Sequence, residues 1–294
     1  YSTQMQNIGK VQNRGMEFTL NTKNLTGEFA WSSNFNISFN KNKVLEVGVD
    51  GRPIYGSAAN ANNAFITKPG YPIASFYGYK YIGVFQSEEE LAKYPHLSGD
   101  KVGDGRYEDV NKDGVLDQND KTILGDNNPL FTAGFSNSFS YKNFTLDIQF
   151  TGSYGAEVFS FYKRMCGIYH GDRNGMIEQL GRWQSKDQPG DGIHFRPTRT
   201  PSGWQRDPSS AWVQDASYLR LRNLTLGYNF DQKVLDKMKM KGLRLYVTGQ
   251  NLFTITNYVG YDPETSSESG LAQGGDYLGY PAARSFIIGA NITF

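Results

Sequence analysis

The chain has 294 residues, and its 30 basic and 29 acidic side chains leave a formal charge of +1, which gives no reason to expect a nucleic-acid partner. A single cysteine, Cys166, excludes an internal disulfide framework. No apolar run reaches the roughly 18 residues that a membrane-spanning helix needs, and neither an apolar leader nor an initiator methionine opens the chain, so we expect an internal start.

Seven segments alternate apolar and polar side chains with the period of a β-strand, and each has about the length that a tilted strand needs to cross a bilayer. They cover residues 12–21, 29–40, 131–141, 144–153, 217–230, 242–252 and 284–294. The polar positions, which would form a hydrated inner wall, are Asn34, Asn36, Ser38, Thr145, Asp147, Gln149, Arg220, Arg222, Arg244, Tyr246, Thr248 and Gln250. The pattern predicts an all-β, transmembrane antiparallel β-barrel.

The fifth segment changes phase, because Leu219 and Leu221 do not share the alternation of Leu224 and Leu226. A β-bulge at residue 222 or 223 would restore the register, so we expect one there.

The last segment ends on an aromatic residue, Phe294. A terminal aromatic on such a strand resembles the signal by which outer-membrane barrels are recognised for insertion. A soluble edge strand could also end this way, so Phe294 favours a membrane barrel without establishing it.

The connections alternate in length, as they do in outer-membrane barrels, where short turns face the periplasm and long loops face outward. Short turns are expected at 22–27, 142–143 and 231–241. Long extracellular loops are expected at 41–130, 154–216 and 253–283.

The first long loop contains a segment, Asp109 to Asp120, that resembles an EF-hand calcium loop. Oxygen ligands would occupy positions 1, 3, 5, 9 and 12, with the Val115 carbonyl at position 7 and Gly114 at the sharp turn. The predicted ligand residues are Asp109, Asn111, Asp113, Val115, Asp117 and Asp120. The twelfth residue is Asp instead of the usual Glu, as in dockerin-like loops, and no clear helices flank the segment. We predict a structural Ca²⁺; the alternative is a solvated turn without a specific ion.

The second long loop carries Trp183, Trp204 and Trp212 among several arginines. Indole rings can stack on sugar or peptide faces, so these three residues are candidate ligand contacts. The alternative is that they form a small core within the loop or face a partner. A short helix is expected at 160–167, where packing explains the apolar residues.

No arrangement of residues suggests catalysis. The three histidines lie in expected loops and lack the spacing of metal ligands: His96, His170 and His194. The basic residues near Cys166 in the sequence give only weak support for a reactive thiol. We therefore predict that the chain is not an enzyme.

Motifs spread over nearly the whole chain resemble the C-terminal barrel region of SusC/RagA-type TonB-linked outer-membrane transporters. They are Asn13 to Glu17, Gly105 to Gly114, Lys121 to Gly125, Asn128-Pro129, Phe131 to Phe135, Ser217 to Tyr228, Leu245 to Phe253 and Tyr261 to Glu264. The resemblance implies a barrel of about 22 strands, of which residues 1–294 would supply the last seven. It also implies import of oligosaccharides or oligopeptides across the outer membrane, a SusD-like surface lipoprotein partner, contact with outer-membrane lipid, and coupling to TonB through a plug domain that this chain lacks.

Two other classes are compatible with parts of the pattern. A secreted soluble carbohydrate-binding β-sandwich would explain the calcium-like loop and the aromatic residues, but it would have shorter and more even connections. An outer-membrane adhesin or secretion barrel would share the strands and the terminal phenylalanine. Partition into detergent would distinguish a transporter from the soluble sandwich. Co-purification with a surface lipoprotein would distinguish it from an adhesin or secretion barrel.

Overall fold

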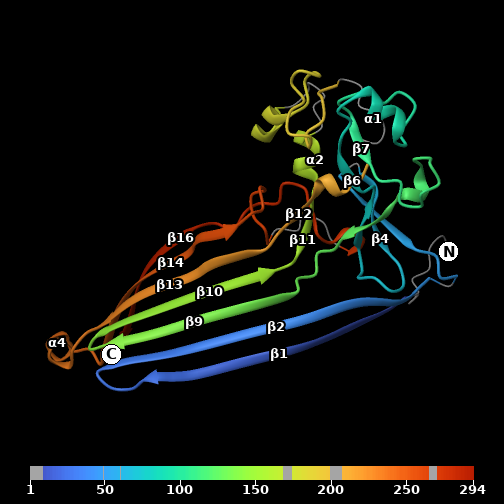
Figure 1. Cartoon of the computed structure of the whole chain (residues 1–294). Helices are drawn as coiled ribbons and strands as arrows, with labels where there is room; N and C mark the ends of the chain where they lie inside the picture. The colour runs from blue at the N-terminus through green and yellow to red at the C-terminus, as the bar shows by residue number, and fades with distance from the viewer. Residues whose placement is uncertain (1–8, 49, 60, 168–173, 199–206, 265–269) are drawn as a thin grey trace, which may run out of the picture.

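The computed structural model describes residues 9–48, 50–59, 61–167, 174–198, 207–264 and 270–294. Its main feature is one antiparallel sheet of seven strands in the order β1-β2-β9-β10-β13-β14-β16 (Figure 1). These strands are β1 (Gly9–Leu25), β2 (Phe29–Val47), β9 (Phe131–Tyr141), β10 (Phe144–Tyr154), β13 (Tyr218–Asn229), β14 (Gly242–Thr256) and β16 (Ser285–Thr293). All seven predicted strands are present, in an order that follows the chain from one edge of the sheet to the other.

The register agrees with the predicted phase change in β13. The pairing of β13 with β14 shifts between Leu221 and Asn223, and the pairing of β10 with β13 shifts between Gln149 and Phe150. Because the bulge adds one residue to β13, Leu221 and Leu224 both lie in the rows of the apolar face of β10.

Three strands, β1, β2 and β14, run several residues further than their apolar alternation predicted. β2 continues to Val47 because β1 pairs with it as far as Gly9, and β14 continues to Thr256, which pairs with Tyr218. Backbone pairing, which the side-chain pattern does not report, extends all three strands. The first and third long connections therefore begin after residues 47 and 256 instead of at 41 and 253, and the first short turn narrows to residues 26–28.

The sheet is open in this chain. β1 and β16 each pair with one strand among the described residues, so the predicted barrel is represented by a curved portion of its wall and is not closed. None of the helices in the described ranges is long and apolar enough to cross a membrane.

The long connections are folded and lie together at one end of the sheet, whereas α4 and the C-terminus lie at the other end (Figure 1). Their strands are β3 (Ile54–Ala58), β4 (Ala61–Thr67), β5 (Ser75–Gly78), β6 (Tyr81–Val84), β7 (Gly105–Tyr107), β8 (Thr122–Gly125), β11 (Glu157–Ser160), β12 (Val213–Asp215) and β15 (Gly275–Asp276). Their helices are α1 (Glu88–Lys93), α2 (Phe161–Gly167), η1 (Gln118–Asp120), η2 (Ile177–Gly181), η3 (Ser210–Trp212) and η4 (Gly270–Ala272), and α4 (Gln232–Met238) occupies the third short connection. The expected helix at 160–167 is α2.

One hydrophobic core joins the three long connections. Phe65 comes from the first, Phe159 and Trp212 from the second, and Ala272 from the third. The rings of Phe65 and Phe159 lie 5.9 Å apart between centroids. The connections thus fold as one unit, which we call the loop unit, while the apolar face of the main sheet is left exposed among the described residues.

Candidate functional site

The segment 109–120 closes on itself through side-chain to backbone hydrogen bonds. Asp109 accepts from the Lys112 and Gly114 amides at 2.6 and 2.9 Å, and Asp113 accepts from the Val115 amide at 2.9 Å. Gly114 has φ +85°, a left-handed conformation that glycine adopts without strain. The sharp turn expected at the sixth position is present.

Asp120 closes the segment from its far end. The carboxylate is fully buried, and its two oxygens accept from the Val110 and Asp117 amides at 2.9 and 2.8 Å. Leu116 anchors the segment in a small core with Tyr79 and Tyr107. The neighbouring Val115 side chain does not join this core and points to solvent, with 58% exposure.

The described residues contain no group of three or more His, Cys, Asp or Glu side chains arranged to hold a metal ion. In this conformation the predicted ligand carboxylates bind backbone amides of the segment instead. Each carboxylate oxygen still has lone pairs that can bind an ion, so bound Ca²⁺ stays a prediction.

Calcium titration of the purified full-length protein tests this prediction. We expect the titration to show a site that the Asp113→Asn variant weakens by at least about tenfold, because one anionic ligand is lost. Asp50→Asn, at an exposed carboxylate outside the segment, is the matched control and should leave the affinity unchanged. Equal calcium binding by both variants and the unchanged protein would exclude the segment as the site.

The described tryptophans of the second long connection serve packing. Trp212 is 3% exposed in the core of the loop unit, so stacking on a ligand would require that core to open. Trp183 is half-buried and packs against the same core. The prediction that Trp212 contacts ligand is therefore not supported by its position, and Trp204 lies outside the described residues.

Gly103 offers a test of the packing around Trp183. It has φ +92°, and a Cβ added there would lie 2.4 Å from the Trp183 ring. We expect Gly103→Ala to loosen the loop unit by roughly 1–3 kcal/mol, measured as faster hydrogen exchange of its amides. Gly99→Ala has a similar φ of +105° but no atom within 4 Å of the added Cβ, so it isolates the steric part of the effect.

A polar cluster around Arg220 ties the third long connection to the main sheet. Arg220 of β13 is buried and binds Asp262 Oδ1 through Nη2 at 2.6 Å, Glu264 Oε2 through Nη1 at 2.5 Å, and Thr254 Oγ1 through Nε at 2.8 Å. Arg222 binds the other Glu264 oxygen at 2.6 Å. We call these five residues the Arg220 clasp.

The clasp also joins the two ends of the connection. Asp262 Oδ2 accepts a hydrogen bond from the Ala282 amide at 2.9 Å. Burial alone would raise the pKa of Asp262, but hydrogen bonds from Arg220 and from the Ala282 and Glu264 amides outweigh it and lower that pKa. The sequence placed Arg220 and Arg222 on the inner wall but gave no sign of partners some forty residues away.

Known proteins resemble this chain in sequence and in fold. No protein-family model matches the chain. The chain is 36% identical to TonB-dependent receptor P3 of Formosa agariphila; the match covers the whole of this chain and 30% of the relative. It is 28% identical to TonB-dependent receptor SusC of Bacteroides thetaiotaomicron; that match covers the whole of this chain and 28% of the relative. The fold matches a chain in the solved structure of the RagAB peptide transporter with a TM-score of 0.78 and 20% identity, over 98% of this chain and 30% of that one.

The chain belongs to the SusC/RagA-type TonB-dependent receptors. It spans about 30% of the length of the curated relatives that it matches. Its sheets align with a portion of the barrel in the RagAB structure, and TonB-dependent receptors sit in the outer membrane.

The receptors of this family are transporters and not enzymes, in agreement with the prediction of no catalytic site. His194 hydrogen-bonds Asp191 at 2.6 Å, His96 lies 3.0 Å from the Tyr94 carbonyl oxygen, and His170 lies outside the described residues. Cys166 is half-buried in α2.

The polar face of the sheet carries a second polar cluster at the end where the short turns lie. Ser138 donates to Asp147 at 2.6 Å, and Arg244 donates to Thr145 at 3.2 Å and lies 4.0 Å from Asp147. The sequence predicted Thr145, Asp147 and Arg244 for a hydrated wall, and the contacts among these side chains agree with a shared polar face.

Proposed function

We propose that this chain forms barrel wall and extracellular loops of an outer-membrane, TonB-dependent importer of oligosaccharides or oligopeptides. The observation that carries the proposal is the combination of a single sheet whose apolar face is exposed with long connections that fold together at one end. Such a sheet suits lipid on one side and a hydrated passage on the other. The RagAB structures, described as a peptide transporter and importer, and the SusC relative support this class of function.

The proposal includes a SusD-like lipoprotein that meets the loop unit. Three apolar side chains of the second connection are strongly exposed and would be covered by such a partner: Ile177, Leu180 and Ile193. TonB would act through a plug domain contributed by another part of the receptor, and Phe294 would serve in insertion. The Ca²⁺ proposed for residues 109–120 would stabilise the loop unit and take no part in transport chemistry.

Purification from outer membranes in mild detergent tests the proposal. We expect the full-length receptor to require detergent and to carry a surface lipoprotein, and we expect oligosaccharide or oligopeptide uptake to stop when the receptor is deleted. A receptor that is soluble without detergent would overturn the membrane assignment. A receptor that needs detergent but affects no uptake would favour an adhesin or secretion barrel.

A double variant tests whether the lipoprotein binds at these exposed apolar residues. Ile177→Asp with Leu180→Asp places two charges on the exposed apolar residues, so we expect loss of the co-purified lipoprotein. Val234→Asp changes an exposed apolar residue in α4, at the opposite end of the sheet, and should retain it. Retention by the double variant would move the partner surface elsewhere.

A further inference from the structure

The apolar face of the sheet has a hollow near the loop unit. Ala133 of β9 and Gly152 of β10 are direct partners, and Gly152 also pairs with Leu219 of β13. The next row toward the short turns contains Phe35, Phe135 and Phe150, which are partners across β2, β9 and β10. Two adjacent small residues therefore leave a gap beside a row of aromatic rings.

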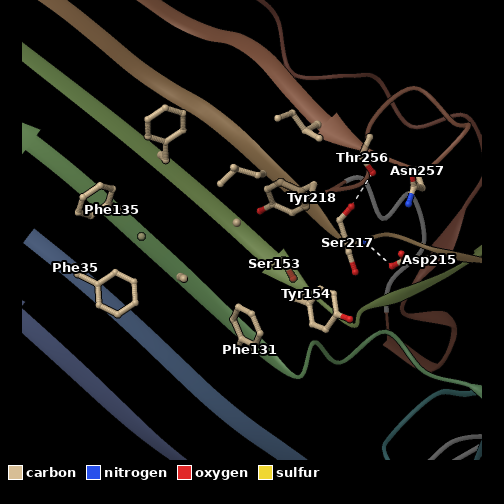
Figure 2. A pocket seen from close by; sticks show the side chains of 16 residues that line it. Phe35, Phe131, Phe135, Ser153, Tyr154, Asp215, Ser217, Tyr218, Thr256 and Asn257 are labelled. Carbon is tan, nitrogen blue, oxygen red and sulfur yellow. Dashed lines mark hydrogen bonds between the residues drawn. The ribbon is translucent and has the colours of Figure 1, made fainter.

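Aromatic side chains also bound the opposite side of this gap. Phe131 and Tyr154 are partners whose rings stack with centroids 5.5 Å apart. Figure 2 shows Phe35, Phe135, Phe131 and Tyr154 around the small residues of β9 and β10. The hollow has a volume of about 520 Å³, which is within the usual range for sites that hold a small molecule.

The end of the hollow nearest the loop unit is polar and acidic. Asp215, Ser217 and Asn257 line it, and Asp215 accepts from the Ser217 amide at 2.8 Å through Oδ1. Glu157 stands opposite Asp215 in the pairing of β11 with β12. None of the described residues that line the hollow is basic, and the formal charge among them, that of Asp215, is negative.

We propose that this hollow seats a phospholipid with an ammonium headgroup. One acyl chain lies over Ala133 and Gly152 between the aromatic rows, and the ammonium group meets the Asp215 carboxylate. The Asn257 amide and the Tyr154 hydroxyl supply donors for the phosphate or ester oxygens. The inference rests on the proposed membrane placement of the sheet, because only then does its apolar face meet lipid.

The shape distinguishes this position from the rest of the apolar face. Aromatic walls and a small-residue floor give an acyl chain contact on three sides, whereas a flat row of large side chains gives contact on one. The carboxylate then selects the headgroup, because an anionic lipid would place its charge beside Asp215 and near Glu157.

Native mass spectrometry of the full-length receptor with equal amounts of phosphatidylethanolamine and phosphatidylglycerol tests the proposal. We expect preferential retention of phosphatidylethanolamine. Ala133→Phe fills the hollow and should weaken that retention by about tenfold, the effect of displacing about two methylene groups of the chain. Leu226→Phe, on the same face but outside the hollow, should retain the lipid. Gly152 is not mutated in this test, because an added Cβ would lie 3.0 Å from the Tyr218 carbonyl oxygen and would disturb the backbone.

The Asp215→Asn variant tests the contact with the headgroup separately from the contact with the acyl chain. It keeps the oxygen that accepts from Ser217 and removes the charge, so the preference for phosphatidylethanolamine should disappear while lipid binding persists. Equal retention by the unchanged receptor and Ala133→Phe, or a preference for phosphatidylglycerol, would overturn the proposal. A receptor that purifies without detergent would instead contradict the membrane placement, and this is seen before any lipid is added.

Discussion

Replacing Arg220 with alanine is expected to detach the third long connection from the sheet. The guanidinium is 3% exposed and is the direct partner of both Asp262 and Glu264, so the variant leaves a buried carboxylate without its cation. Breaking a buried pair from one side costs about 3–5 kcal/mol, more than most single substitutions. The expected result is faster hydrogen exchange across 257–264 and a lower denaturant midpoint for the receptor in detergent.

Two controls separate charge from packing. Arg220→Met with Asp262→Asn and Glu264→Gln removes both signs of charge together, and we expect it to cost less than Arg220→Ala. Arg284→Ala removes an exposed arginine of the same region and should have little effect. If the single and triple variants are equally unstable, the clasp contributes through packing and not through its ion pairs.

The clasp also predicts a pH dependence. Because the folded-state pKa of Asp262 is lowered, its contribution is complete above the unfolded-state value of about 4 and is lost as the pH falls through the folded-state value. The stability difference between the unchanged receptor and the triple variant should therefore be constant from neutral pH to about pH 5 and shrink below about pH 4. A difference that grows on acidification would contradict the ion-pair account.

Much of the sheet was predictable because its strands follow a period of two. The phase change after Leu221 was enough to place the bulge, and the two-residue connection 142–143 was enough to pair β9 with β10. Chain order and loop length then gave the arrangement in which long connections share one end.

The clasp and the loop unit were not predictable from local pattern, because their contacts join distant parts of the chain. Arg220 and Asp262 are 42 residues apart, and Trp212 packs in a core that includes Phe65. An aromatic residue in a long loop has the same local sequence whether it stacks on a ligand or fills a core. Only tertiary packing separates these alternatives, and for Trp212 it favours the core.

Ile288→Arg is expected to prevent stable insertion of the receptor, although Ile288 is one of the most exposed large apolar residues in the described part of the chain. In a soluble protein, an isoleucine with 84% exposure could be replaced by arginine at little cost. Ile288 pairs with Val247, which pairs with Leu226, so an exposed apolar row crosses three strands. If lipid covers this row, a charge there costs about 2–4 kcal/mol near the bilayer midplane.

Thr293→Arg provides the matched control on the same strand. Thr293 pairs with Gly242 on the polar face, where an added charge meets water and no like charge stands opposite it, so insertion should remain intact. Outer-membrane yield and heat-modifiable migration of the two variants measure the difference. Loss of folded receptor for Ile288→Arg alone would support lipid on the apolar face, and equal yields would contradict it, because an exposed apolar row tolerates a charge only where water, and not hydrocarbon, surrounds it.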